Sequence, residues 1–187
     1  SGMVVIGVNY RLLTTATIDQ ILDDTAAAVA WAFRHAEEYN GSTKKIFLSG
    51  HSAGGYLISM IGLDKHYLEA YGVDANEIAG LIPFSGQAIT HYNVRKQQGI
   101  GPLQPTIDKY APISFCRADC PPMVIISGDR EIELFGRYEE QAYFYRMLLL
   151  NGAKDVKLYE MQGYDHGGMP FPAFPILKNE IKRIISK

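Results

Sequence analysis

The motif that most constrains the fold of this chain is Gly-His-Ser-Ala-Gly-Gly at residues 50–55. It follows the apolar run 46–48 and precedes a helix-forming stretch, so the chain must pass from strand to helix in one sharp turn. Such a turn strains the backbone of Ser52 and lifts its hydroxyl clear of the sheet. We expect the turn to require glycine at positions 50 and 54, because a Cβ on Gly50 or Gly54 would meet the neighbouring strand and helix. The plainer alternative is a small-residue turn in which Ser52 only caps the helix.

Strand-length apolar runs alternate with helical periodicities along the rest of the chain. Strand patterns cover residues 4–8, 45–49, 80–85, 123–127 and 156–161, and helical patterns cover residues 17–40, 53–62, 134–150 and 174–185. All-apolar strands are typical of a sheet covered on both faces, whereas the alternating run 156–161 suits an edge strand. This order predicts an α/β fold with a mostly parallel sheet and helices on both faces.

Bulk properties limit the classes of partner. The 187 residues, 47% of them hydrophobic, are enough for a single domain over residues 1–187. A formal net charge of −2 gives no electrostatic case for binding nucleic acid, and no apolar run is long enough to span a membrane. Cys116 and Cys120 lack a second ligand pair, so we expect no metal, and no other cofactor. We expect the protein to be cytoplasmic.

Polar residues directly follow three of the expected strands. They are Ser52, the pair Asp129 and Glu131, and His166. The carboxyl ends of parallel strands meet at one edge of the sheet, where ligands bind. A serine hydroxyl needs a base within hydrogen-bond reach, and that base needs an orienting carboxylate. His166 is the preferred base, and we expect His51 to point away at the turn.

The identity of the carboxylate stays open among three residues. Glu131 is favoured because it stands three residues beyond Gly128, far enough into the loop to reach an imidazole. Asp129 lies closer to the strand end, where it would cap the turn or pair with Arg130. Asp165 is adjacent to His166, and adjacent residues seldom face each other.

Residues 87–120 form a long stretch rich in glycine, proline and polar residues, with no clear period. Long irregular loops in compact domains are usually lids or binding loops. We therefore expect this loop to line a pocket, with Gln87, His91 and Tyr92 contacting a bound small molecule.

At these residues the chain resembles the α/β-hydrolase superfamily. More narrowly, it is similar to the esterase and lipase group of hormone-sensitive-lipase-like, feruloyl or acetyl-xylan esterase-like and kynurenine-formamidase-like proteins. The resemblance rests on the turn motif at 50–55, Tyr-Arg-Leu at 10–12, Tyr-Ala-Pro-Ile at 110–113 with Pro-Pro at 121–122, Gly-Asp-Arg-Glu at 128–131 and Asp-His at 165–166.

The resemblance implies a serine hydrolase that cleaves small or medium carboxylic esters through an acyl-enzyme on Ser52. His166 would move the proton, Glu131 would orient His166, and the amide of Ala53 would receive the oxyanion. Two alternatives stay open: an inert binding protein with the hydrolase fold, and an amide hydrolase of the kynurenine formamidase type.

The chain departs from the family at its N-terminal end. The family carries a His-Gly-Gly segment upstream of Tyr-Arg-Leu, on a strand that lies between the Tyr-Arg-Leu strand and the turn strand. We therefore expect an N-terminally truncated hydrolase fold with a gap in the sheet and impaired oxyanion binding. The orphaned sheet edges would be covered by a second copy of the chain, or by strand 4–8 moving inward beside the turn strand.

Overall fold

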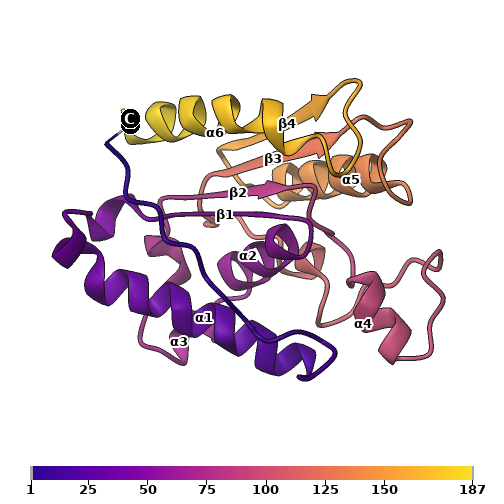
Figure 1. Ribbon diagram of the computed structural model, residues 1–187, viewed down its shortest axis with the longest axis horizontal. Coiled ribbons are helices and arrows are strands. Elements are labelled where there is room, and N and C mark those ends of the chain that lie inside the picture. The colour runs from indigo at the N-terminus through magenta and orange to yellow at the C-terminus, as the bar shows by residue number, and fades with distance from the viewer. Residues whose placement is uncertain (1, 187) are drawn as a thin grey trace.

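The computed structural model describes residues 2–186 and places a four-stranded sheet at the centre of the molecule (Figure 1). All three strand pairs are parallel, and the spatial order of the strands is their order in the sequence. The expected parallel sheet is therefore confirmed, and the last strand lies at an edge as its alternating pattern predicted. The strands are β1 (Phe47–His51), β2 (Gly80–Phe84), β3 (Met123–Gly128) and β4 (Val156–Met161).

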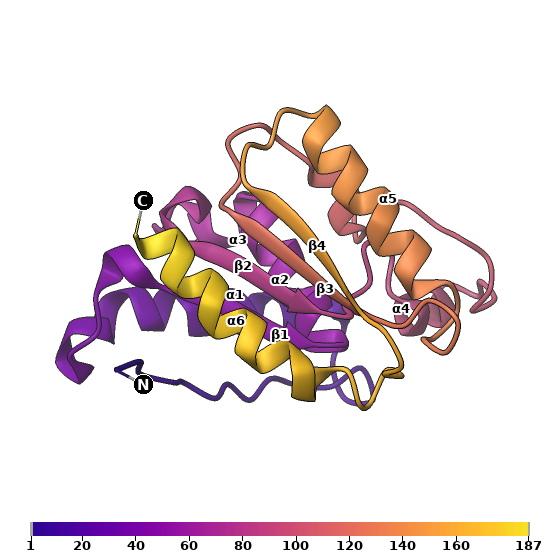
Figure 2. The ribbon, with the colours of Figure 1, turned by 90° about the horizontal axis from the view of Figure 1, so that it is seen from above.

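Helices cover both faces of the sheet, as predicted. Figure 2 shows α6 crossing one face, while α2 and α5 lie against the other and α1 packs outside α2. Within residues 2–186, no helix combines the length and apolar character needed to cross a membrane. The α-helices are α1 (Ile18–His35), α2 (Ala53–Leu63), α3 (His66–Glu69), α4 (Tyr92–Gln97), α5 (Arg137–Leu150) and α6 (Pro170–Ile185), and short 3-10 segments occur at Ala36–Tyr39, Thr43–Lys45, Ala75–Glu77 and Pro112–Phe115.

Alternating side chains of the central strands divide the core in two. Leu81 and Met123 point to the α1, α2 and α5 side, whereas Ile82 and Val124 point to α6. All four side chains are fully buried. Because successive residues of a strand face opposite sides, a sheet covered on both faces needs a continuous apolar run, which is what β2 and β3 carry.

The N-terminal segment contradicts the prediction of a first strand at residues 4–8. These residues pair with no described strand, and Val5 is 88% exposed. The segment is instead anchored to α1: the guanidinium of Arg11 bonds both carboxylate oxygens of Asp24, at 2.6 and 2.8 Å, and Tyr10 packs against the core. In Figure 1 the indigo chain passes across the near side of the molecule to reach this anchor.

Residues 4–8 do not move inward to form a strand beside β1. The described sheet has no internal gap, because β1 is its first strand. That part of the prediction was wrong. Association with a second copy through the β1 edge stays a prediction.

Candidate active site

The turn between β1 and α2 holds Ser52 in a strained backbone conformation. Its φ of 55° and ψ of −114° lie outside the regions that L-residues ordinarily occupy. The Ser52 side chain makes no hydrogen bond to the helix backbone, so it is not a helix cap. Strain of this kind is tolerated only where the surrounding structure enforces it, and it is typical of functional turns.

Close backbone packing explains two of the three glycines at this turn. A Cβ on Gly50 would lie 2.5 Å from the carbonyl carbon of Gly54, and one on Gly55 would lie 2.9 Å from the Cα of Gly86. A Cβ on Gly54 would meet nothing within 4 Å. The expectation is therefore confirmed for Gly50 and wrong for Gly54, whose place is taken by Gly55.

His166 bridges Ser52 to a buried carboxylate, and that carboxylate belongs to Glu133. The Nε2 atom of His166 lies 2.8 Å from the Oγ of Ser52, and its Nδ1 atom lies 2.7 Å from Oε1 of Glu133. The side chain of Glu133 is 1% exposed. The three groups form an unbroken hydrogen-bonded chain from hydroxyl to imidazole to carboxylate.

The expected contact between Glu131 and His166 is absent from the structure. Residues 129–133 form one helical turn, closed by a 2.9 Å bond from the amide of Glu133 to the carbonyl of Asp129. This turn carries Glu131 outward into solvent and brings Glu133 back under the imidazole. The expected carboxylate lies in the correct loop, but the side chain that contacts His166 is two residues further along, at Glu133.

The two aspartates that were alternatives hold turns together. The carboxylate of Asp129 accepts bonds from the amides of Glu131 and Gly163, at 2.9 and 2.7 Å, so it is the turn cap that we gave as its other role. The carboxylate of Asp165 accepts a 2.8 Å bond from the amide of Gly168. Both therefore fix the loops that carry Glu133 and His166.

Ser85 completes the surroundings of Glu133. Its hydroxyl donates to Oε2 of Glu133 at 2.6 Å, and its oxygen lies 3.2 Å from Nδ1 of His166. Burial acts to raise the pKa of Glu133, but the hydrogen bonds from His166, Ser85 and the amide of Leu134 outweigh it and lower this pKa to about 2. Glu133 is therefore ionised at neutral pH.

Sequence reasoning missed Ser85, although one signal marked it. Ser85 directly follows β2, as Ser52 follows β1 and Asp129 follows β3, and it has a φ of 49°. The rule that ligand-binding residues gather at the carboxyl ends of parallel strands applies to it equally.

His51 does not point away from the site, as we had expected. Its Nε2–H donates to the carbonyl oxygen of His166 at 2.8 Å, and the two rings lie 4.6 Å apart. Burial, followed by the proximity of His166, lowers the pKa of His51, so the ring is a neutral and fixed donor. His51, which directly precedes Ser52, thus holds the backbone of His166 in place.

Replacement of His51 tests this positioning role. We expect His51→Phe to lower kcat about tenfold with little change in KM, because His166 loses a backbone anchor while the space stays filled. His51→Gln, which keeps a side-chain N–H, should recover most of the rate. Equal losses in both variants, or a fall in kcat that simply tracks a fall in Tm, would contradict the positioning role.

The three residues that we expected to contact a bound small molecule differ in their burial and in their contacts. Gln87 is buried, accepts a 2.9 Å bond from the amide of Tyr92 and lines a small cavity. The ring of His91 is buried between Tyr56 and Tyr92 and caps α4 through the amide of Asn93, so it holds the loop together. Tyr92 is half-buried and stays a candidate for substrate contact.

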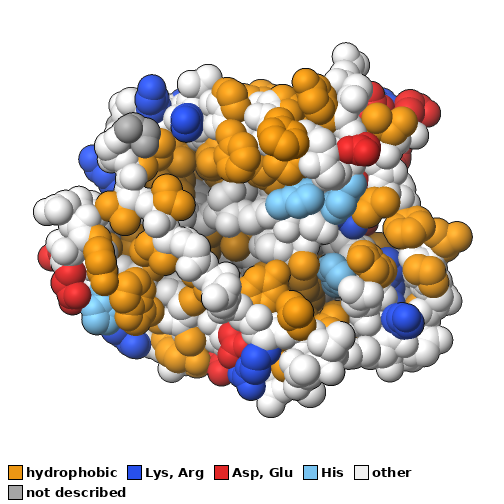
Figure 3. Space-filling model, viewed as in Figure 1, with side chains coloured by type: hydrophobic (Ala, Val, Ile, Leu, Met, Phe, Trp, Pro, Cys, Tyr) orange, Lys and Arg blue, Asp and Glu red, His pale blue; other side chains and the backbone are white. Residues whose placement is uncertain are grey.

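The surface around the site combines histidine with hydrophobic side chains. Figure 3 shows histidines side by side in a hollowed part of this face, next to a group of hydrophobic side chains. Among residues 2–186, no three His, Cys, Asp or Glu side chains come together as a metal-binding group. The chemistry available at this edge is that of a hydroxyl, an imidazole and a carboxylate.

Comparison with known sequences places this geometry in a family. The BD-FAE family matches residues 1–134. The chain belongs to the BD-FAE family. It is also 27% identical over 145 residues to the probable carboxylic ester hydrolase LipM of Mycobacterium tuberculosis, and 36% identical over 69 residues to an acetyl esterase of Salmonella paratyphi B. These alignments cover 68% and 35% of this chain, but only 33% and 21% of the two relatives.

Solved structures agree with the BD-FAE assignment at the level of the fold. A truncated carbohydrate esterase from gut microbiota matches with a TM-score of 0.78 and 17% identity, covering 96% of this chain and 73% of that one. Esterase 2 of Thermogutta terrifontis, phosphoramylated by tabun, matches with a TM-score of 0.74 and 22% identity, covering 95% and 69%. The fold is that of the α/β-hydrolase superfamily of esterases and lipases, as the sequence resemblance implied.

Proposed function

We propose that this protein is a serine hydrolase that cleaves small or medium carboxylic esters through an acyl-enzyme on Ser52. The observation that carries the proposal is the hydrogen-bonded chain from Ser52 through His166 to Glu133. A hydroxyl with an imidazole 2.8 Å away can lose its proton as it attacks a carbonyl carbon.

The proton moves along a path that the side chains define. Nε2 of His166 takes the proton of Ser52 and later gives it to the leaving alcohol, while Nδ1–H stays bonded to Glu133. The ionised carboxylate stabilises the imidazolium that forms in between. Water then attacks the acyl-enzyme by the same route, with His166 again as the base.

Negative charge on the carbonyl oxygen is received at the start of α2. The amide of Ala53 is the first of this helix, and the leading amides of a helix have no acceptor within it. They therefore donate to an oxyanion, assisted by the helix dipole. The β1 edge lies next to this position, and His51 at the end of β1 bonds the backbone of His166.

The related proteins support the same class of reaction. Two curated relatives are named as a carboxylic ester hydrolase and an acetyl esterase. Because the chain spans only a third or less of each, their activities enter here as support for a proposal.

A substrate panel tests the proposal. We expect hydrolysis of p-nitrophenyl acetate and butyrate well above the buffer rate, with p-nitrophenyl palmitate much slower. A formylated aryl amine in the same panel detects the amide hydrolase alternative. Turnover of the aryl amide in preference to the esters would replace the ester proposal, and turnover of none would favour the inert binding protein.

A further inference from the structure

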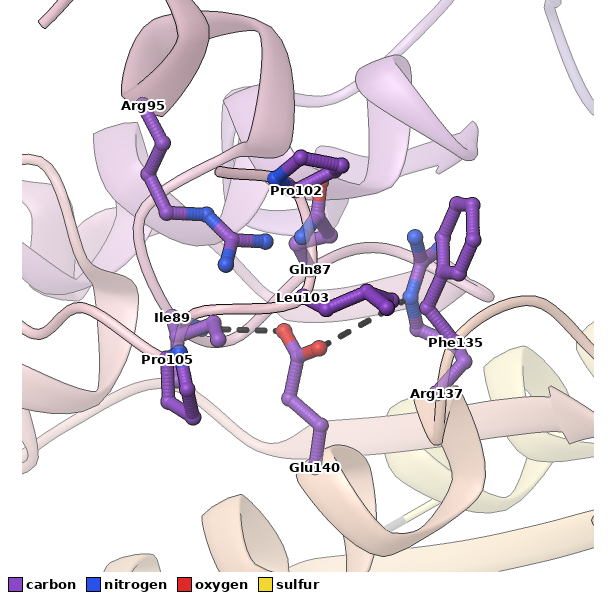
Figure 4. Close-up of a pocket in the computed structure, with 9 residues that line it drawn as sticks. All are labelled: Gln87, Ile89, Arg95, Pro102, Leu103, Pro105, Phe135, Arg137 and Glu140. Atoms are coloured by element: carbon purple, nitrogen blue, oxygen red, sulfur yellow. Dashed lines mark hydrogen bonds and ion pairs between the residues drawn. The ribbon is translucent and has the colours of Figure 1, made fainter. Parts of the chain in front are cut away.

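A small, partly open cavity lies between the loop that follows β2 and the first turn of α5 (Figure 4). Its volume is about 80 Å³. It is connected to the site by two short segments, since Gln87 stands two residues after Ser85 and Phe135 stands two residues after Glu133. The lining residues used below are Gln87, Arg95, Pro102, Leu103, Arg137 and Glu140.

The side chains that line this cavity carry one more positive than negative charge. Arg95 is 3% exposed and Arg137 is 2% exposed, and Glu140 is the only acidic residue that lines the cavity with them. Glu133 also lies within electrostatic range of Arg137, but its oxygens are bonded to His166 and Ser85 and it does not line the cavity. Buried cations are strongly unfavourable unless they are paired, so the cavity favours an anion.

The carboxylate of Glu140 is largely committed elsewhere. Its Oε1 accepts bonds from the amides of Ala88 and Ile89, at 2.5 and 3.0 Å. Its Oε2 lies 3.9 Å from Nε of Arg137, which is an ion pair but too long for a hydrogen bond. Glu140 is therefore shared between the two arginines, and Arg95 forms no hydrogen bond with it among the described residues.

Arg95 supplies a donor with no acceptor. It donates through Nη1 to the carbonyl of Gln104, but its buried Nε atom has no hydrogen-bond partner among the described residues. Figure 4 shows its guanidinium turned into the cavity, facing Gln87 and Leu103. A buried polar group without a hydrogen-bond partner is rare in proteins, so this Nε–H is available to bind an acceptor on a ligand.

We propose that this cavity binds a small carboxylate that pairs with Arg95. A carboxylate matches the planar fork of a guanidinium, and its single charge matches the single unbalanced cation. A buried water needs roughly 10–15 Å³ of such space, so 80 Å³ accommodates a group of several heavy atoms. The side chains of Pro102 and Leu103 provide apolar contacts for the carbon atoms of the ligand.

Two sources of the carboxylate are compatible with this chemistry. It is either a free small carboxylate or the second carboxylate of a dicarboxylic half-ester whose ester group is at Ser52. The half-ester source rests on the proposed esterase function, whereas binding of a free carboxylate does not.

Binding is measured first, in the Ser52→Ala background so that no turnover occurs. Sodium acetate is titrated against sodium chloride at equal ionic strength, and Tm is followed. We expect a saturable rise specific to acetate, of roughly 3–6 °C at ten times the Kd. A rise no larger than that in chloride would overturn the proposal.

Two substitutions with opposite expected effects separate binding from loss of folding. Arg95→Gln should weaken acetate binding at least tenfold, whereas Glu140→Gln, which removes the competing negative charge, should tighten it about fivefold. Arg146→Gln removes an exposed positive charge from the same helix as Glu140 and should leave the Kd unchanged. Weaker binding in both cavity variants, or unchanged binding in Arg95→Gln, would contradict the proposal.

Kinetics then identify the source. If the substrate supplies the carboxylate, Arg95→Gln raises KM at least tenfold for p-nitrophenyl hemisuccinate and less than twofold for p-nitrophenyl butyrate. If a free carboxylate is the ligand, Arg95→Gln changes the two KM values equally and acetate does not compete with the charged ester. Failure to hydrolyse either ester would count against the esterase proposal alone, since the acetate titration is independent of turnover.

Discussion

Ser52→Ala is expected to lower the rate of ester hydrolysis by about 10⁴–10⁶-fold, because the attacking oxygen is removed. Among residues 2–186, the strained turn places the hydroxyl of Ser52 2.8 Å from Nε2 of His166, and no other hydroxyl bonds this atom. The rate of p-nitrophenyl acetate hydrolysis at neutral pH measures the effect.

Ser59→Ala is the matched control for this prediction. Ser59 lies on the same helix, but its hydroxyl donates to the carbonyl of Gly55 at 2.8 Å and takes no part in the site. We expect it to keep the rate within about threefold of the parent protein. Similar rates for Ser52→Ala and Ser59→Ala would show that the measured hydrolysis does not use Ser52.

Glu133→Gln is expected to lower kcat by about 10³–10⁴-fold. The amide keeps the size of the side chain but cannot stabilise the imidazolium, and it no longer favours the tautomer with a proton on Nδ1 of His166. Ester hydrolysis with the folded variant, checked by circular dichroism, measures this loss.

Glu131→Gln provides the control for Glu133→Gln. It removes the same charge two residues away, from a side chain that lies in solvent. We expect less than a twofold change in kcat. The reverse pattern, with a large loss in Glu131→Gln and little in Glu133→Gln, would restore the original assignment and contradict the structure.

Local patterns were enough to predict the fold of the described chain. The apolar runs that became β2 and β3 are buried by a sheet with helices on both faces, and the alternating run became the edge strand β4. The helical period at 17–40 became α1, which begins with a capping box of Thr17 and Gln20 and is followed by the 3-10 segment Ala36–Tyr39. Residues 4–8 show where this reasoning fails. An apolar run becomes a strand only if a sheet edge receives it, and here the Arg11–Asp24 pair anchors the chain just after this run to α1 while residues 4–8 stay exposed.

The sequence predicted two of the three residues of the hydrogen-bonded chain, Ser52 and His166, but not Glu133. Ser52 and His166 come together because both follow parallel strands, which topology alone implies. Glu133 could not be distinguished from Glu131 because the choice depends on a single helical turn at 129–133, and spacing from Gly128 does not reveal that turn. The glycine itself is informative in retrospect: a Cβ on Gly128 would lie 2.6 Å from Oε2 of Glu133.

His51 illustrates a second limit of sequence reasoning. His51 is the last residue of β1, so the alternation of the strand puts its side chain on the α6 face with Phe47, and His166 lies in the loop that leads to α6. The ring therefore lies over His166 and bonds its carbonyl, although the sequence suggested the opposite.

The most direct test of the proposed chemistry is the site at which a fluorophosphonate attaches. Such a reagent forms a stable covalent bond with a serine oxygen only when that oxygen is activated as a nucleophile. Peptide mass spectrometry of the labelled protein should find one adduct per chain, on Ser52, with labelling slowed strongly in Glu133→Gln and unchanged in Glu131→Gln. A protein that stays unlabelled, or an adduct on a different residue, would contradict the assignment of Ser52, His166 and Glu133 as the catalytic residues.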